Sequence, residues 1–177
     1  ALESGGRFVV AVGGDGTVHE VVNGMFDDEG KPLVPDAVLG VVAAGSGCDF
    51  VRTFGLPGDS TRACYHLAGD NTYPLDVGKI TYTAEGGDRA IRYFVNVAEA
   101  GLGDQPGHAV AARADRMSPR LGQSKCFVGF WLELPRFKLA NVRVQADRKT
   151  YEGPAFLVVV ANAQYYGGGM KISPRSY

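Results

Sequence analysis

Short apolar runs and helical spacings of apolar residues follow one another along the first part of the chain. A continuous run at 8–12 ends in glycines, and Val18, Val21, Val22 and Met25 then recur with the spacing of one helix face. Continuous β-branched runs are typical of strands buried in a parallel sheet, and the spacing i, i+3, i+4, i+7 is typical of an amphipathic helix. The pattern therefore predicts a strand, a glycine loop and a helix in succession.

The same order recurs over the next thirty residues or so of the chain. An apolar run at 38–43 precedes the glycine loop 45–47, and helices are predicted at 48–54 and 62–67. Consecutive strand–loop–helix units favour a parallel sheet, because each helix returns the chain to the edge of the sheet at which the previous strand began. Both glycine loops are therefore expected at the carboxyl edge of the sheet, where ligands bind in such folds.

From about residue 72 the pattern predicts strands with few helices between them. The apolar runs stand at 75–82, 91–98, 142–146 and 156–161, and a helical insert is predicted over 108–134. Strands joined without helices are typical of antiparallel sheets. We therefore expect a partial α/β domain with a parallel sheet over 1–70. A mainly antiparallel, β-rich domain is expected over 71–177, incomplete at its C-terminal end, with the boundary near 69–71.

Composition adds an excess of glycine and an uneven distribution of charge. Of 177 residues, 25 are Gly, about twice the usual share of ~7%. The 45% apolar and 21% charged residues exclude a highly charged, disordered chain. The net charge of −1 argues against a basic nucleic-acid binder, so no nucleic-acid partner is expected. Residues 1–70 carry 4 basic and 10 acidic side chains, whereas 108–150 carry 9 and 3, which indicates two functionally distinct regions.

The cysteines and the length of the apolar runs bear on location. Cys48, Cys64 and Cys126 are odd in number and have no C-x-x-C spacing, which favours a reducing compartment. No apolar run approaches the roughly 18 residues that a membrane span requires. A cytoplasmic location is therefore expected.

The first glycine loop, 13–17, carries the first candidate chemistry. Backbone amides of glycines at the start of a helix form a cradle for phosphate. The third glycine of the dinucleotide fingerprint is missing, and no P-loop sequence occurs. A capping box is predicted from Thr17 to Glu20. Asp15 has two interpretations: a carboxylate that holds a metal ion or a proton beside the phosphates, or one that stabilises a turn or cap.

The second glycine loop repeats this arrangement with another Asp. Asp49 follows the loop, and Arg52 lies three residues further on, on the same predicted helix face. One interpretation places both residues beside the first loop, at the same phosphate site. The other is an ordinary ion pair on the helix surface, which stabilises a helix by a few tenths of a kcal/mol.

Five segments, in this order, resemble the diacylglycerol kinase catalytic domain family, which includes sphingosine kinases and bacterial lipid kinases. The segment from Val10 to Gly24, VAVGGDGTVHEVVNG, resembles the nucleotide-binding segment of that family. The later segments are GSGCDFVR at 45–52, LDVGK at 75–79, FVNVA at 94–98 and YGGGM at 166–170.

The resemblance implies a fold, a reaction and a set of residues. It implies an N-terminal α/β domain like that of phosphofructokinase and NAD kinase, a β-rich domain after it, and an active site in the cleft between them. ATP and Mg²⁺ are the implied cofactors. Catalytic roles are implied for Asp15, also the implied metal ligand, Asp49 and Asp76; a turn at a strand end is the alternative for Asp76. The implied nucleotide-binding residues are Gly13, Gly14, Gly16, Thr17, Glu20, Ser46, Gly47 and Arg52.

A basic and aromatic segment at 108–138 is predicted to contact the membrane that contains the lipid substrate. Arg113, Arg116 and Arg120 precede an apolar group formed by Phe127, Val128, Phe130, Trp131 and Leu132. Basic residues on anionic headgroups, with aromatics towards the acyl chains, are typical of peripheral membrane association. The alternative is a helix packed into the core with a solvated basic face.

Taken together, the sequence predicts an ATP- and Mg²⁺-dependent kinase of a diacylglycerol-like or sphingoid lipid. Two alternatives stay open: a kinase of a soluble acceptor, like NAD kinase, and a nucleotide-binding fragment without catalysis. A homodimer is one expectation for the assembly, and the sequence does not distinguish it from a monomer.

Overall fold

The computed structural model of the chain describes residues 2, 4–45, 48–84, 86–100, 128, 131–132 and 139–176. The chain divides into two compact units, one formed by Ala1–Val97 with Ala161–Tyr177 and the other by Ala98–Val160. The boundary predicted near 69–71 differs from this division and stays a prediction.

The first unit opens with two parallel strands and a helix between them. Strands β1 (Phe8–Gly13) and β2 (Val38–Ala43) pair in parallel, from Phe8 opposite Val38 to Gly13 opposite Ala43. Helix α1 (Asp15–Asn23) connects them, which confirms the predicted parallel α/β order.

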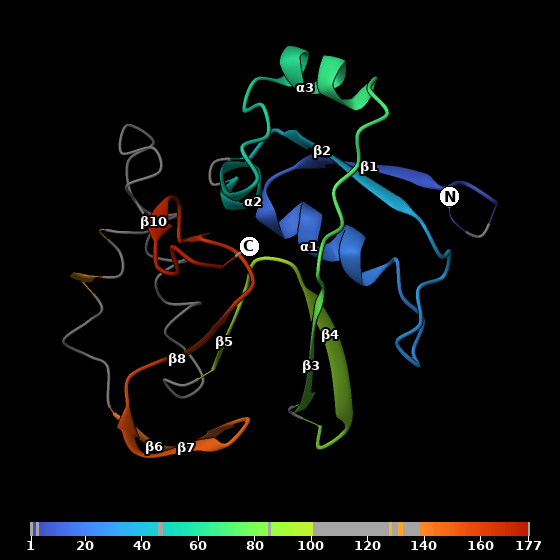
Figure 1. Ribbon diagram of the computed structural model, residues 1–177. Coiled ribbons are helices and arrows are strands. Elements are labelled where there is room, and N and C mark those ends of the chain that lie inside the picture. Colours follow the sequence, from blue (N-terminus) through green and yellow to red (C-terminus); the bar gives the residue numbers. More distant parts are fainter. Residues whose placement is uncertain are drawn as a thin grey trace. The chain divides into compact units, whose positions relative to one another are not determined.

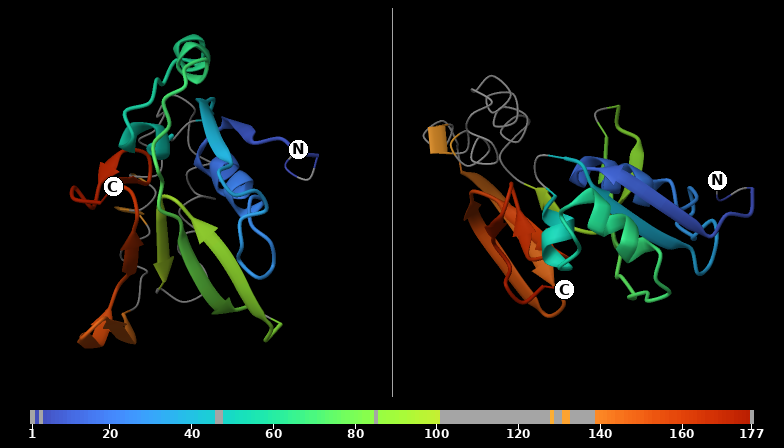
Figure 2. Two further views of the ribbon diagram at one scale, coloured as in Figure 1. Left: turned by 45° about the vertical axis from the view of Figure 1, so that its right-hand side comes forward. Right: turned by 90° about the horizontal axis from the view of Figure 1, so that it is seen from above.

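Two helices cover opposite faces of this strand pair (Figure 1). Alternate residues of a strand point to opposite faces. Ala11 and Val41 are buried against Val18 and Val22 of α1. On the other face, a Cβ added at Gly40 would lie 2.7 Å from Leu67 of α3 (Ser60–Leu67). In the right-hand view of Figure 2, α3 lies in front of β1 and β2.

The predicted N-cap of α1 is wrong by three residues. Gly14, with an extended backbone, is the N-cap, and no side chain caps the helix. A glycine at this position lets the helix begin directly after the strand, so Thr17 falls inside the first turn. Glu20, predicted to complete the capping box, instead points to the surface, with its carboxylate 3.8 Å from Arg92.

An antiparallel hairpin completes the first unit's core. Strands β3 (Gly78–Thr83) and β4 (Arg89–Phe94) pair from Gly78 opposite Phe94 to Thr83 opposite Arg89. Asn23, at the end of α1, accepts a hydrogen bond from the Tyr93 amide and donates one to the Tyr93 carbonyl, both at 2.9 Å. This amide therefore fastens α1 to β4.

The strand predicted at 91–98 is interrupted. It divides into β4 and β5 (Val97–Ala100), because the backbone at Asn96 leaves the ladder and its carbonyl accepts a hydrogen bond from Asn162 (2.8 Å). Near the end of this unit, β9 (Tyr165–Tyr166) and β10 (Met170–Lys171) form a short antiparallel pair.

The second unit is described in part. Strands β6 (Ala140–Ala146) and β7 (Lys149–Ala155) form an antiparallel hairpin, and β8 (Val158–Ala161) pairs with β5. The antiparallel, β-rich character predicted for this part of the chain is confirmed. Most of the predicted insert 108–134 lies outside the described residues. Within the described ranges, no helix is long and apolar enough to cross a membrane.

The two glycine loops touch each other at the carboxyl ends of β1 and β2. The Ala44 amide donates to the Gly13 carbonyl at 3.0 Å. A Cβ added at Gly45 would lie 2.8 Å from the Gly14 nitrogen, and one at Gly14 would lie 3.3 Å from the Gly45 Cα. The backbones are thus too close for a side chain to lie between them.

We expect Gly45→Ala to destabilise the protein by about 1–3 kcal/mol, because the added methyl group forces the two loops apart. Urea-unfolding midpoints of the complete gene product measure the effect. Gly58→Ala is the matched control, since a Cβ at Gly58 meets nothing within 4 Å. Equal midpoints for the two variants would contradict the close contact.

Candidate active site

The carboxylate of Asp15 joins the two loops. Its Oδ2 accepts the Asp49 amide at 2.9 Å, and its Oδ1 accepts the Phe50 amide at 2.9 Å. These are the first two backbone amides of helix α2 (Asp49–Thr53). Oδ1 also accepts the side-chain amide of Asn96 at 3.1 Å. Asp15 therefore caps the neighbouring helix rather than its own, a role that the turn-or-cap interpretation did not foresee.

The second carboxylate, Asp49, is buried beside the first. Its Oδ1 accepts from Arg52 Nη1 at 2.7 Å, and its Oδ2 accepts the Gly168 amide at 2.8 Å. Burial raises the pKa of Asp49, and the Asp15 charge adds to the rise, whereas the Gly168 amide and Arg52 oppose it. Only 5% of the side chain is exposed, so the interpretation of Asp49–Arg52 as an ordinary surface pair is wrong.

A run of three glycines at 167–169 contacts Asp49 and Arg52. Gly167, Gly168 and Gly169 all have φ in the left-handed region, at 65°, 87° and 111°, which strongly favours glycine. A Cβ added at Gly169 would lie 2.7 Å from Arg52 Nη1. The Arg52 guanidinium also lies over the Tyr165 ring, 5.5 Å from its centroid. The glycine turn thus brings a backbone donor to Asp49 and leaves room for Arg52.

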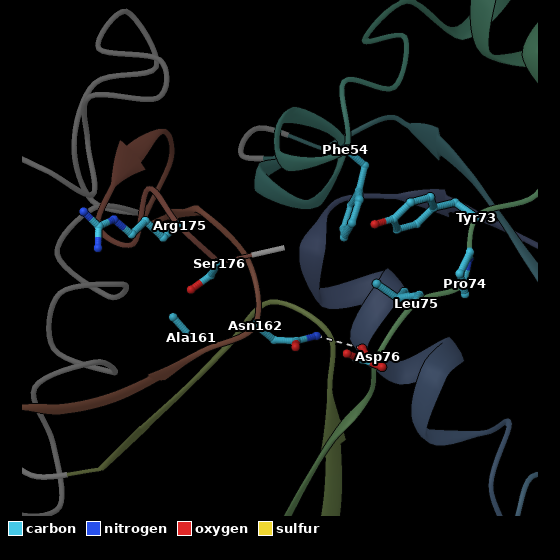
Figure 3. A pocket seen from close by; sticks show the side chains of 9 residues that line it. All are labelled: Phe54, Tyr73, Pro74, Leu75, Asp76, Ala161, Asn162, Arg175 and Ser176. Atoms are coloured by element: carbon cyan, nitrogen blue, oxygen red, sulfur yellow. Dashed lines mark hydrogen bonds between the residues drawn. The ribbon is translucent and has the colours of Figure 1, made fainter.

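Two asparagines connect Asp15 to Asp76. Asn96 donates to Asp15 through its side chain, and its carbonyl accepts the Asn162 amide at 2.8 Å. The Asn162 side chain donates in turn to the Asp76 carbonyl at 2.7 Å and to the Val95 carbonyl at 3.2 Å. Asp76 itself is exposed and lines a cavity (Figure 3).

These two asparagines are site residues that the sequence reasoning missed. Asn96 lies within one of the segments that carry the family resemblance, and Asn162 directly follows an apolar run. The available signal was a polar residue within or directly after an apolar run. Its meaning depended on a contact between residues 66 positions apart, which no local pattern reveals.

The other predicted residues are distributed over the same region. Gly13 and Gly14 form the loop contact, and Gly16 and Thr17 are exposed in the first turn of α1. Glu20 is turned towards Arg92, on the surface between α1 and β4. Ser46 and Gly47 lie outside the described residues.

The residues fit a magnesium ion held largely by phosphate. Mg²⁺ is usually bound by one or two carboxylates together with substrate phosphates and waters, not by a cage of protein ligands. The described part of the chain contains no group of three or more His, Cys, Asp or Glu side chains arranged to hold a metal. Asp15 offers a carboxylate, and the neighbouring Asn96 Oδ1 is buried without a hydrogen-bond partner among the described residues.

We expect Arg52→Ala to destabilise the protein by about 1–3 kcal/mol, because it leaves a buried carboxylate with one donor fewer. The loss should be larger at pH 7 than near pH 4. Since the pKa of Asp49 is raised above its ordinary 3.8, the folded state binds this proton more tightly than the unfolded chain. The contribution of Asp49 to the free energy of unfolding therefore falls as the pH rises through its folded pKa. Arg52 stabilises only the ionised form of Asp49, so its removal costs more at pH 7, where Asp49 is ionised, than at pH 4.

Urea midpoints at the two pH values measure this dependence. Arg92→Ala is the control, because its pair with Glu20 is exposed at 3.8 Å and should contribute ~0.2–1 kcal/mol. A loss for Arg52→Ala that is no larger at pH 7 than at pH 4 would contradict the described pairing.

Comparisons with known proteins agree with the resemblance. Residues 1–80 match the family described as "Diacylglycerol kinase catalytic domain". Residues 105–177 match the one described as "YegS C-terminal NAD kinase beta sandwich-like domain".

Similar proteins carry related names. A diacylglycerol kinase from Staphylococcus haemolyticus is 28% identical over 174 residues, covering 98% of this chain and 48% of the relative. One from Bacillus subtilis is 29% identical over 169 residues, covering 95% and 50%. A crystal structure of a diacylglycerol kinase from Bacillus anthracis is 27% identical with a TM-score of 0.60, covering 93% and 48%.

The chain thus spans about half the length of the curated relatives that it matches. The two matched domains follow each other in one polypeptide, in the order that the sequence segments predicted. With the parallel strand pair and the joined glycine loops, residues 1–80 are assigned to the diacylglycerol kinase catalytic domain family, and residues 105–177 to the NAD kinase-like β-sandwich domain that follows it.

Proposed function

We propose that the protein is a lipid kinase that transfers the γ-phosphoryl group of ATP to the hydroxyl of a diacylglycerol-like or sphingoid lipid, with Mg²⁺. The observation that carries the proposal is the contact between the two glycine loops, joined by the Asp15 carboxylate. The names of the relatives support a lipid as the acceptor.

The first turn of α1 is the proposed cradle for the phosphates. A helix leaves its first N–H groups without intrahelical acceptors, and its dipole favours an anion there. Gly13, Gly14 and Gly16 let phosphate oxygens approach the backbone, and Thr17 adds a hydroxyl at an exposed position. Ser46, Gly47 and Glu20 stay proposed nucleotide-binding residues on the strength of the family resemblance.

Asp15 and Asp49 have different proposed roles. Asp15 is partly exposed, and three N–H donors fix its orientation, so it can hold Mg²⁺ or orient the acceptor hydroxyl. Asp49 is buried, and its oxygens are engaged by Arg52 and Gly168. We therefore propose that Asp49 positions these groups without contacting the substrate. Mg²⁺, when bound, neutralises charge on the phosphates.

Transfer from radiolabelled ATP to a panel of acceptors tests the function. In the complete gene product we expect label on a diacylglycerol or sphingoid base, lost on chelation of Mg²⁺ and restored by its addition. NAD is the soluble acceptor in the panel. Label on NAD alone would favour the soluble-acceptor alternative, and nucleotide binding without transfer would favour the non-catalytic one.

Asp15→Asn should lower the transfer rate about a hundredfold or more, the scale typical of a lost group that acts on a proton or a metal. One Asn oxygen can still accept an amide, so nucleotide binding and the unfolding midpoint should change less than the rate. Asp28→Asn, in an exposed loop, is the matched control and should leave the rate unchanged. A normal rate in Asp15→Asn would contradict the assigned role.

We also propose that the protein meets its substrate at a membrane surface. The support is the net charge of +6 over 108–150, together with Trp131 and Leu132, whose side chains are exposed among the described residues of this region. The three arginines of the segment lie outside the described residues. Basic and aromatic side chains together favour an anionic bilayer surface.

Co-sedimentation with vesicles tests this interaction. The complete gene product should sediment with anionic vesicles and much less with neutral ones. Replacing Arg113, Arg116 and Arg120 by Gln should reduce the binding, because each basic residue near an anionic surface contributes about 1 kcal/mol. Equal binding to both kinds of vesicle, unchanged in the triple variant, would contradict the proposal.

A further inference from the structure

A cavity of about 400 Å³ lies in the first unit, beside the network that connects Asp15 to Asp76. Four segments that are distant in the sequence form it (Figure 3). Phe54 follows α2, the stretch 73–76 precedes β3, and Asn162 follows β8. Ala161, Arg175 and Ser176 complete the lining.

The walls of this cavity differ in chemistry. The rings of Phe54 and Tyr73 lie with their centroids 6.3 Å apart, and Pro74 and Leu75 extend this apolar side. Asp76 and Asn162 lie together at another side, joined by the hydrogen bond drawn in Figure 3. A ligand with a polar head and an apolar stem satisfies both kinds of wall.

The polar side of the cavity is connected to Asp15 by hydrogen bonds through two asparagines. Asn162 binds the Asp76 carbonyl through its side chain and the Asn96 carbonyl through its amide. Asn96 then donates to Asp15 Oδ1. A single residue, Asn96, thus connects the cavity wall to the carboxylate at the phosphate cradle. Two hydrogen bonds, from Asn162 to Asn96 and from Asn96 to Asp15, therefore link the polar wall to this carboxylate.

We infer that this cavity is the subsite for the polar head of the acceptor lipid, with the first carbons of its chain against Phe54 and Tyr73. The inference rests on the proposed kinase function and names the residues that select the acceptor. A volume of about 400 Å³ is near the lower end of ligand pockets, ~300–1,000 Å³. It therefore accommodates the head and leaves the rest of the chain outside.

The same walls are less suited to the nucleotide phosphates. The lining contains the Asp76 carboxylate as well as the Arg175 guanidinium, so it offers no excess of positive charge, and it contains none of the glycine-loop amides. A triphosphate would meet an anion there, whereas the first turn of α1 offers N–H groups. Tyr73, 67% exposed, is the aromatic side chain at which the subsite can be changed with the least effect on the core.

Labelling of an introduced thiol tests occupancy without requiring turnover. Tyr73→Cys is made in the complete gene product with Cys64→Ser, because Cys64 is exposed and free. The rate of alkylation at position 73 is followed by mass spectrometry, with a short-chain diacylglycerol below its aggregation concentration, with a short-chain sphingoid base, or with ATP. Tyr65→Cys, on the exposed face of α3, is the matched control.

One of the two lipids should slow alkylation at position 73 about tenfold when it is present at ten times its Kd, and leave position 65 unaffected. ATP should protect neither position. Protection at 73 by ATP alone would assign the cavity to the base of the nucleotide and overturn the inference. Absence of protection by either lipid, or equal protection at 65, would overturn it as well.

Kinetics separate this inference from the proposed function. Tyr73→Ala should raise KM for the acceptor about tenfold, as expected for lost apolar contact with a substrate chain, and leave KM for ATP within about twofold. Tyr65→Ala should change neither constant. A wild-type protein that transfers no phosphoryl group to lipid would refute the function. A normal acceptor KM in an active Tyr73→Ala variant would refute only the subsite.

Discussion

The first unit depends on the contact between two glycine loops that a single carboxylate holds together. Glycines let the backbones at the ends of β1 and β2 approach until no side chain fits between them. Asp15 then reaches across and accepts the first amides of α2. This one side chain therefore fixes the second helix relative to the first. The negative charge is also placed beside the amides that begin α1, where it can hold the counter-ion of a phosphate.

The two neighbouring carboxylates are kept distinct by their partners. Asp15 is held by neutral N–H donors and stays partly exposed, whereas Asp49 is buried and relies on Arg52 and the Gly168 amide. Burial and the nearby Asp15 charge raise the pKa of Asp49, whereas the Gly168 amide and Arg52 oppose the rise. The arrangement separates a group available for chemistry from one that supports it.

Local pattern was sufficient for the strand, loop and helix order and for the two Gly–Asp loops, because periodicity and glycine placement are local properties. It was not sufficient for the helix start, since an extended Gly14 replaced the side-chain cap expected at Thr17. Asn96 and Asn162 escaped notice because their importance lies in contacts between distant segments. The same holds for the turn 167–169, whose role appears only once Asp49 and Arg52 lie against it.

The central claim is that the first-turn amides of α1 bind the nucleotide phosphates while the Asp15 carboxylate keeps its hydrogen bonds to the amides of Asp49 and Phe50. Hydrogen–deuterium exchange of the complete gene product, with and without a non-hydrolysable ATP analogue and Mg²⁺, tests it most directly. Exchange in the peptide covering 13–20 should slow on binding, and the amides of Asp49 and Phe50 should exchange slowly in both states. Protection confined to other segments, or fast exchange at Asp49 and Phe50 without nucleotide, would contradict this account.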